Sequence, residues 1–368
     1  MRGLYVHVPF CVKKCSYCDF YSVPLQNGFI DLYIQALLIE FRSYQGLSFD
    51  TLYLGGGTPS LLGPDNLIRL IDGLRHAFDL SNLVEATIEV NPESSTVRLL
   101  EAAKSSGINR ISIGVQSLCQ QELERVGRVH TAAQAVDAVE QAKNIGFKTI
   151  SADLMIGLPG QNWKTVHTSL EALTSHGIDH LSLYCLSLEH DTPLALNPPV
   201  DLPSDDTQAD LFEMATLFLD KHEFKHYEIS NFAIAGHECL HNLIYWRGGE
   251  YLGLGPAAAS HIEGKRFRNR SDLYAYLKTP AHLVEDIEEL KTKDKAAEET
   301  MLRLRLLDEG VNPNDLVKRF GQENIGDLVG RLNEMATAGD LIFDGSRFRL
   351  ATSRILTSNP IFVRVLFG

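Results

Sequence analysis

Long apolar runs are missing from this chain of 368 residues, and so is an excess of positive charge. No uninterrupted apolar stretch approaches the roughly 20 residues that a membrane-spanning helix needs. A total of 34 Lys and Arg against 47 Asp and Glu gives a net charge of −13. Because phosphate backbones are bound by clustered Lys and Arg, this balance argues against a nucleic-acid partner. The basic segment 265–270 is a local exception.

A secretory signal is also missing from the N-terminal residues. Residues 1–8 lead directly to Pro9 and the first cysteine, with no hydrophobic stretch followed by small residues. We therefore expect a cytoplasmic protein, in which thiols stay reduced. In that compartment the six cysteines of the chain indicate metal binding or catalysis before disulfides.

The first 235 residues alternate β-rich runs with amphipathic helical stretches. Apolar patterning predicts strands at 4–10, 51–54, 86–90, 110–115, 149–156, 180–186 and 227–231. It predicts intervening helices at 29–42, 65–78, 97–105, 132–144 and 163–175. Such alternation builds a parallel sheet with helices outside it. Because unusual glycine and polar residues fall at the strand ends, we expect an α/β fold with a partial (β/α) barrel of the TIM type.

The remaining chain predicts a connecting segment and a small C-terminal domain. We place the barrel at 1–235, the connecting segment at 236–294 and a mostly helical, winged-helix-like domain at 295–368. The last domain is predicted to contain helices at 295–307, 313–320 and 325–338, then a hairpin of 341–343 and 347–350. Residues 248–264 are rich in Gly and Ala, which predicts a loop where backbone approaches a ligand.

Three of the six cysteines fall within eight residues. Cys11, Cys15 and Cys18 form a C-x3-C-x2-C pattern on a loop just after the first predicted strand. Three thiolates at this spacing can ligate three irons of a cubane [4Fe–4S] cluster and leave one iron open. Zinc is the alternative, although paired C-x2-C units are missing and no fourth ligand is evident nearby. The other cysteines are scattered: Cys119, Cys185 and Cys239.

A glycine-rich stretch, Leu-Gly-Gly-Gly-Thr-Pro-Ser at 54–60, follows the second predicted strand. Glycines let a ligand approach the backbone, whose N–H groups can hold carboxylate or ribose oxygens. Together, the cysteine triplet and this stretch resemble the radical S-adenosylmethionine (SAM) superfamily. The resemblance implies a cluster whose open iron chelates the methionine end of SAM, with Tyr17 near the adenine. Reductive cleavage of SAM then supplies a radical, so the hard chemistry belongs to the cofactor.

More specifically, residues 1–250 resemble two related groups, the oxygen-independent coproporphyrinogen III oxidases and the HemW-type heme chaperones. The stretches that carry the resemblance are 5–11, 55–60, 88–92, 113–117 and 153–159. It implies a SAM site lined by Tyr5, Tyr17, Gly56, Gly57, Thr58, Glu89, Gln116, Arg128 and Asp153. Glu89 and Asp153 would bind the amino group or the ribose hydroxyls, and Arg128 the carboxylate. Without the resemblance, a solvated or helix-capping role fits either acidic residue equally well.

Two departures separate this chain from the oxidases. Phe20 stands where their pattern C-x3-C-x2-C-x-C has a fourth cysteine. The oxidases also carry a longer N-terminal extension that reaches into their active site, whereas only ten residues precede Cys11 here. Both departures argue against oxidative decarboxylation of coproporphyrinogen.

The string His241-Asn242-Leu-Ile-Tyr245-Trp246 resembles the H-N-x-x-Y-W heme-binding motif of the HemW-type chaperones. Imidazole is a standard axial ligand of heme iron, and Tyr and Trp supply flat apolar surface with a polar edge. We therefore expect heme contact at these four residues, with His241 as the candidate ligand; a lone histidine is otherwise a hydrogen-bonded structural residue.

A basic segment and five further histidines have no specific role in this interpretation. The segment 265–270 suits pairing with heme propionates or an acidic partner, and equally a solvated loop. The remaining candidate histidines are expected on helix surfaces or loops without a special role: His76, His130, His167, His176 and His222.

These resemblances imply a heme chaperone with a SAM-bound [4Fe–4S] cluster. It would bind heme and deliver it to heme-dependent proteins such as respiratory enzymes, meeting the membrane only through those partners. A homodimer is compatible with the sequence. The alternatives are an oxygen-independent coproporphyrinogen III dehydrogenase and a radical SAM enzyme acting on another tetrapyrrole, so cleavage of SAM stays open.

Overall fold

A computed structural model describes residues 1–281 and 284–368. Its main sheet consists of β1 (Arg2–Val8), β4 (Thr51–Gly56), β5 (Glu85–Val90), β6 (Arg110–Gln116), β7 (Thr149–Ile156), β8 (His180–Cys185), β9 (Lys225–Glu228), β10 (Asn231–Ala233), β11 (Glu250–Leu254), β12 (Ala259–Ile262), β13 (Lys265–Asn269) and β14 (Val284–Glu288). The helices before residue 280 are α1 (Phe29–Glu40), α2 (Gly63–Ala77), α3 (Val97–Ser105), α4 (Gln120–Arg125), α5 (Ala132–Ile145), α6 (Trp163–Ser175), α7 (Pro193–Leu196), α8 (Asp205–Lys221), α9 (Leu240–Trp246) and α10 (Leu273–Lys278).

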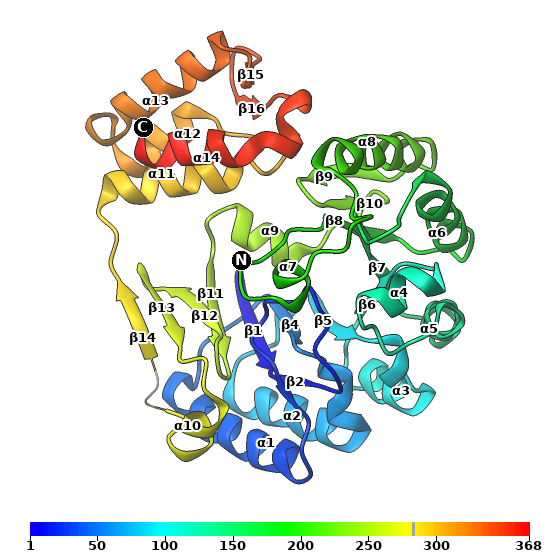
Figure 1. The fold of residues 1–368 in the computed structure, drawn as a ribbon. Coiled ribbons are helices and arrows are strands. Elements are labelled where there is room, and N and C mark those ends of the chain that lie inside the picture. The colour runs from blue at the N-terminus through cyan, green and yellow to red at the C-terminus, as the bar shows by residue number, and fades with distance from the viewer. Residues whose placement is uncertain (282–283) are drawn as a thin grey trace.

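The sheet is a partial barrel, as the sequence predicts. Strands β1, β4, β5, β6, β7 and β8 lie side by side in parallel, with helices along the outside (Figure 1). The last predicted strand is split by a turn: β10 runs antiparallel to both β8 and β9. Because β9 and β14 occupy opposite edges of the sheet order, the barrel does not close.

Residues 236–294 contribute strands to this same sheet. β11 pairs in parallel with β1, and β12, β13 and β14 follow as antiparallel neighbours. The prediction of a loop over 248–264 is therefore wrong for most of that segment. Gly253 shows why a glycine is needed within this strand, because a Cβ there would lie 2.2 Å from the carbonyl oxygen of Ala259. The glycine thus permits close strand packing.

A second, smaller core lies beyond the sheet. It is formed by α11 (Thr292–Arg303), α12 (Pro313–Phe320), α13 (Gln322–Thr337), the hairpin of β15 (Leu341–Phe343) and β16 (Phe348–Leu350), and α14 (Ser358–Phe367). The predicted helices and hairpin are confirmed, whereas the closing helix α14 has no counterpart in the prediction. The bundle lies beside α9 in Figure 1. Arg247, directly after α9, forms an ion pair with Glu309. None of the described helices has the length and apolarity to cross a membrane.

A buried carboxyl connects α1 to segments more than 200 residues away. Glu40 is 2% exposed and accepts hydrogen bonds from the Tyr276 hydroxyl (2.6 Å), the Asn269 amide (2.6 Å) and the Gly255 N–H (2.9 Å). Burial raises the pKa of Glu40 to about 7, against the opposing effect of these donors. The contacts join α1 to β13 and α10.

Removing the Tyr276 hydroxyl tests this connection. Tyr276→Phe leaves a buried carboxyl oxygen with one donor fewer, so we expect the free energy of unfolding to fall by about 1–3 kcal/mol. Urea titration followed by circular dichroism measures it. Tyr274→Phe, at an exposed position of the same helix, is the matched control. Equal stability of the two variants would show that Glu40 does not depend on this donor.

Candidate functional site

The three cysteines lie on a loop fixed to the barrel at several points. The loop follows β2 (Phe10–Cys11), and the backbone N–H of Ser16 donates to the carbonyl of Val126 (3.0 Å). The carbonyl of Ser16 accepts from the N–H of Leu194 (2.9 Å). Backbone contacts with α7 and the end of α4 thus hold the loop above the strand ends.

The glycine stretch after β4 brings backbone close to this loop. A Cβ at Gly57 would lie 2.6 Å from the carbonyl oxygen of Phe10, so a larger residue would push the two segments apart. Gly56 has a φ of +114°, a conformation that L side chains rarely adopt. Gly57 is therefore required by the approach of β2 to β4, and Gly56 by its own backbone conformation.

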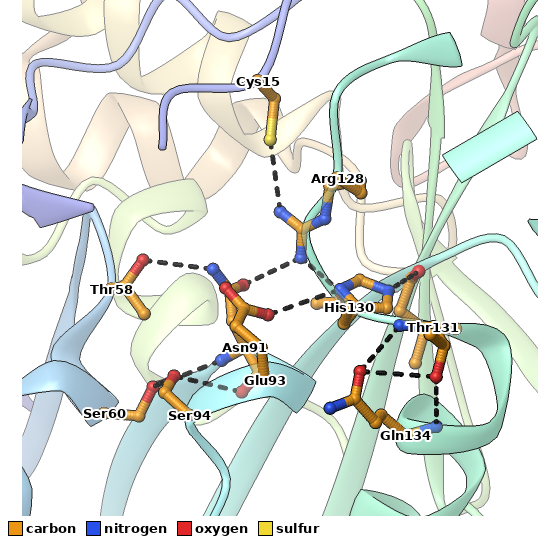
Figure 2. Close-up of polar contacts among 12 residues, drawn as sticks. Cys15, Thr58, Ser60, Asn91, Glu93, Ser94, Arg128, His130, Thr131 and Gln134 are labelled. Carbon is orange, nitrogen blue, oxygen red and sulfur yellow. Dashed lines mark hydrogen bonds and ion pairs between the residues drawn. The ribbon is translucent and has the colours of Figure 1, made fainter. Parts of the chain in front are cut away.

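The Arg128 guanidinium connects the cysteine loop to two strand ends, as Figure 2 shows. Nη1 lies 3.5 Å from the Cys15 sulfur, while Nη2 donates to the Asn91 side chain (2.9 Å) and the Gly114 carbonyl (2.7 Å). Asn91 in turn donates to the Thr58 hydroxyl (3.1 Å). The Nε–H of Arg128 is buried and has no partner among the described residues. A fixed cation with an unused donor therefore faces the thiols.

Two half-buried carboxyl groups complete the strand ends. Glu89 accepts from the Tyr53 hydroxyl (2.8 Å) and the Gly56 N–H (3.2 Å), and Asp153 accepts from the Ser112 hydroxyl (3.2 Å). Burial raises the pKa of Glu89 to about 7, and it also raises that of Asp153. The charge of Asp153 also disfavours ionisation of Glu89, so a cation bound in the cavity would stabilise the anion.

These side chains surround one cavity of about 530 Å³, the cysteine cavity. Its lining includes the three cysteines and eight of the nine residues expected at SAM: Tyr17, Gly56, Gly57, Thr58, Glu89, Gln116, Arg128 and Asp153. Tyr5 instead lines the neighbouring cavity, where its hydroxyl lies 3.0 Å from Nδ1 of His7. The sequence motifs, scattered over 150 residues, therefore converge at one place.

The donor set suits a cluster better than a single ion. Across residues 1–281 and 284–368, no three His, Cys, Asp or Glu side chains converge as they would around one metal ion. A [4Fe–4S] cluster is held by thiolates, and three half-buried cysteines border the same cavity here.

The chain is similar to a known family of proteins. Residues 5–173 match the family model of the radical SAM superfamily. A Lactococcus lactis protein named heme chaperone HemW is 38% identical over 308 residues, which cover 83% of this chain and 81% of that protein. The chain belongs to the HemW family. The Bacillus subtilis member is 33% identical over 373 residues, covering 98% of both chains.

A solved structure shares the fold over the whole chain. The coproporphyrinogen III oxidase HemN of Escherichia coli, described as a radical SAM enzyme, superimposes with a TM-score of 0.87 at 22% identity. The match covers 100% of this chain and 90% of HemN, which confirms the radical SAM barrel. The match of residues 5–173 to the radical SAM family model implies a [4Fe–4S] cluster and SAM.

A second cavity, of about 800 Å³, lies between the barrel and the C-terminal helices. We name it the aromatic cavity because Phe20, Tyr245, Trp246, Tyr251 and Phe320 line it. Phe20, Gly56 and Glu89 also border the cysteine cavity, so the two cavities share a wall. The volume falls within the range of roughly 300–1,000 Å³ typical of cofactor sites.

The H-N-x-x-Y-W string is divided between this cavity and the core. It forms α9, whose first N–H groups are bound by the Glu85 carboxylate (2.9 and 3.1 Å). Tyr245 and Trp246 line the aromatic cavity. His241 points into the core: it is 1% exposed, and its nitrogens contact the Thr51 hydroxyl and the Tyr245 hydroxyl, each at 2.7 Å. Asn242, on the same helix, is half-buried.

Sequence reasoning assigned no role to Asn91, which lines the cysteine cavity, or to the His130–Glu93 pair. Asn91 is two residues after Glu89. Side chains two apart in an extended chain point to the same face, so this spacing could have indicated that Asn91 lies beside Glu89. His130, expected on a helix surface or loop without a special role, lies on the loop before α5 and is only 1% exposed: Nε2 donates to the Val115 carbonyl (3.1 Å) and Nδ1 lies 3.5 Å from a Glu93 oxygen (Figure 2). Only tertiary contacts reveal that pair.

Replacing His241 is expected to damage the fold directly. His241→Ala leaves two buried hydroxyls without their imidazole partner and opens a cavity beside Tyr53, which stacks on the ring at 5.2 Å. We expect a loss of about 3 kcal/mol in the free energy of unfolding. Chemical denaturation measures the loss, with His190→Ala at a fully exposed position as control. Unchanged stability would contradict the structural role of His241.

Proposed function

We propose that this chain is a heme chaperone, which binds heme and delivers it to heme-dependent proteins such as respiratory enzymes. Relatives named heme chaperone HemW cover most of both chains at 33–38% identity. The observation that carries the proposal is the aromatic cavity, a large space with flat apolar walls directly beside the cysteine cavity. A planar macrocycle is bound by such aromatic surfaces.

The cysteine cavity would hold the resident cofactors. Cys11, Cys15 and Cys18 would ligate the [4Fe–4S] cluster, and the unused N–H of Arg128 suits the carboxylate of SAM. Glu89 and Asp153 would accept from the amino group or the ribose hydroxyls. When bound, the cluster and SAM together supply one-electron chemistry. The shared wall would allow occupancy of this cavity to influence the other.

The heme proposal has a direct test against the rival decarboxylase. After anaerobic reconstitution of the cluster, heme is titrated into the full chain and followed by absorbance. A parallel anaerobic assay supplies SAM, a reductant and coproporphyrinogen. We expect saturable heme binding near one equivalent and no decarboxylated product. Decarboxylation without specific heme binding would overturn the proposal and favour the dehydrogenase; consumption of heme would favour an enzyme acting on tetrapyrroles.

Replacing each cysteine of the triplet tests whether it ligates the cluster. In Cys11→Ala, Cys15→Ala or Cys18→Ala we expect loss of most reconstituted iron and of the absorbance of the cluster, because a ligand thiolate is missing. Iron and sulfide analysis gives the measurement. Cys185→Ala is the matched control, since this thiol borders the same cavity outside the triplet. Wild-type iron content in all three variants would refute the ligand assignment.

Glu89 gives the proposed SAM site a pH dependence. Its raised pKa, about 7, means that the carboxylate that would attract the SAM ammonium forms only as pH rises through 7. We expect SAM affinity to increase over that interval, and Glu89→Gln to lower affinity about tenfold at pH 8 and flatten the profile. Anaerobic calorimetry measures affinity. Glu189 is an exposed carboxylate of the same cavity, so Glu189→Gln should keep the wild-type dependence of SAM affinity on pH. If Glu89→Gln also kept that dependence, Glu89 would not be the group that attracts the SAM ammonium.

A further inference from the structure

The aromatic cavity contains a histidine outside the H-N-x-x-Y-W string whose ring is arranged for metal binding. His261 lies on β12, opposite Tyr251 of β11, and is half-buried. Its Nδ1 is 3.2 Å from the carbonyl oxygen of Gly249. Its Nε2 has no hydrogen-bond partner in the described parts of the chain, and the side chain lines the cavity.

The contact with Gly249 determines the tautomer. A carbonyl oxygen only accepts, so Nδ1 carries the proton and donates it, and Nε2 of the neutral ring keeps its lone pair. Histidines that bind metals usually donate their other ring N–H to a backbone carbonyl or a carboxylate, which fixes the ring and increases its basicity. His261 already has this arrangement.

The other two candidate histidines lack a free nitrogen. His7 also lines the cavity, but Nδ1 contacts the Tyr5 hydroxyl (3.0 Å) and Nε2 the Tyr21 carbonyl (2.9 Å). His241 is engaged at both nitrogens and buried behind Tyr245. Either ring would have to break a buried hydrogen bond before it could bind iron, at a cost of about 1–3 kcal/mol.

The walls near His261 suit a planar dianion. The ring of Tyr251 packs edge-on against Tyr245, with centroids 4.5 Å apart, and against His261 at 6.2 Å. The C-terminal domain contributes Lys295 and Arg319 to the same cavity, and Arg319 pairs with Glu299 (2.8 Å). Lys295 makes no ion pair within the described residues, so it can meet a carboxylate without losing a partner. Apolar surface, a free imidazole nitrogen and a cation thus border one space.

We infer that His261 is the axial ligand of the heme iron, with the macrocycle in the aromatic cavity and a propionate directed to Lys295. The inference rests on the proposed function, since it names the ligand for the proposed cargo. On this assignment His241 maintains α9 and presents Tyr245 and Trp246, so that it is a positioning residue for the heme site.

The test uses heme spectra of the full chain after cluster reconstitution. Ferric heme is added to the wild type, His261→Ala and His190→Ala, and the heme contribution is obtained by subtracting the spectrum of each protein without heme. In His261→Ala we expect a shifted Soret band, loss of the imidazole-ligand signal in electron paramagnetic resonance, and at least tenfold weaker binding. Added imidazole should restore the wild-type heme spectrum. His190→Ala should match the wild type.

Two comparisons keep the outcomes distinct. Wild-type protein that fails to bind heme would overturn the proposed function, and this ligand assignment with it. Wild-type protein that binds heme while His261→Ala retains both spectrum and affinity would overturn the assignment alone. His241→Gln keeps polar atoms for both hydroxyls and should retain the imidazole-ligand signal. If His241→Gln lost that signal while His261→Ala kept it, His241 would be the ligand of the heme iron.

Discussion

The half-buried guanidinium of Arg128 holds the cysteine loop to the ends of the parallel strands. It contacts the Cys15 sulfur, the Asn91 side chain and the Gly114 carbonyl, and Asn91 extends the chain of contacts to Thr58. A buried cation requires anionic or hydrogen-bonding partners, because burial without them costs several kcal/mol. This requirement fixes the loop relative to β4, β5 and β6, and the cysteine cavity depends on it.

The second constraint is the open edge of the barrel. Because β11 pairs with β1 and the sheet then turns into antiparallel strands, the chain leaves space between that side and the C-terminal helices. The space is the aromatic cavity. Glu89 and Phe20 border both cavities, so a change of charge at Glu89 would alter the electrostatic potential in both. Phe20, 65% exposed, supplies an apolar surface where the oxidase pattern has a thiol.

Much of the cysteine cavity could be predicted because many of its residues lie at or near the carboxyl ends of strands. Parallel strands that share a direction bring their carboxyl ends to one edge, so Gly56, Glu89 and Asp153 had to converge once the strands were identified. The edge strands were harder. The segment 248–264 was predicted as a loop since its glycines suggested flexibility, whereas Gly253 allows Ala259 to approach closely. Composition does not distinguish these two uses of glycine.

The sequence by itself determined the barrel, the cysteine triplet and the residues that meet at the strand ends, because local periodicity and motif spacing encode them. Only the tertiary structure decided which histidine has a free nitrogen. The partners of His241 include Thr51, 190 residues earlier, and the carbonyl that orients His261 belongs to Gly249, in the turn between α9 and β11. Hydrogen bonds between distant segments leave no local pattern, so the availability of an imidazole is determined by the folded chain.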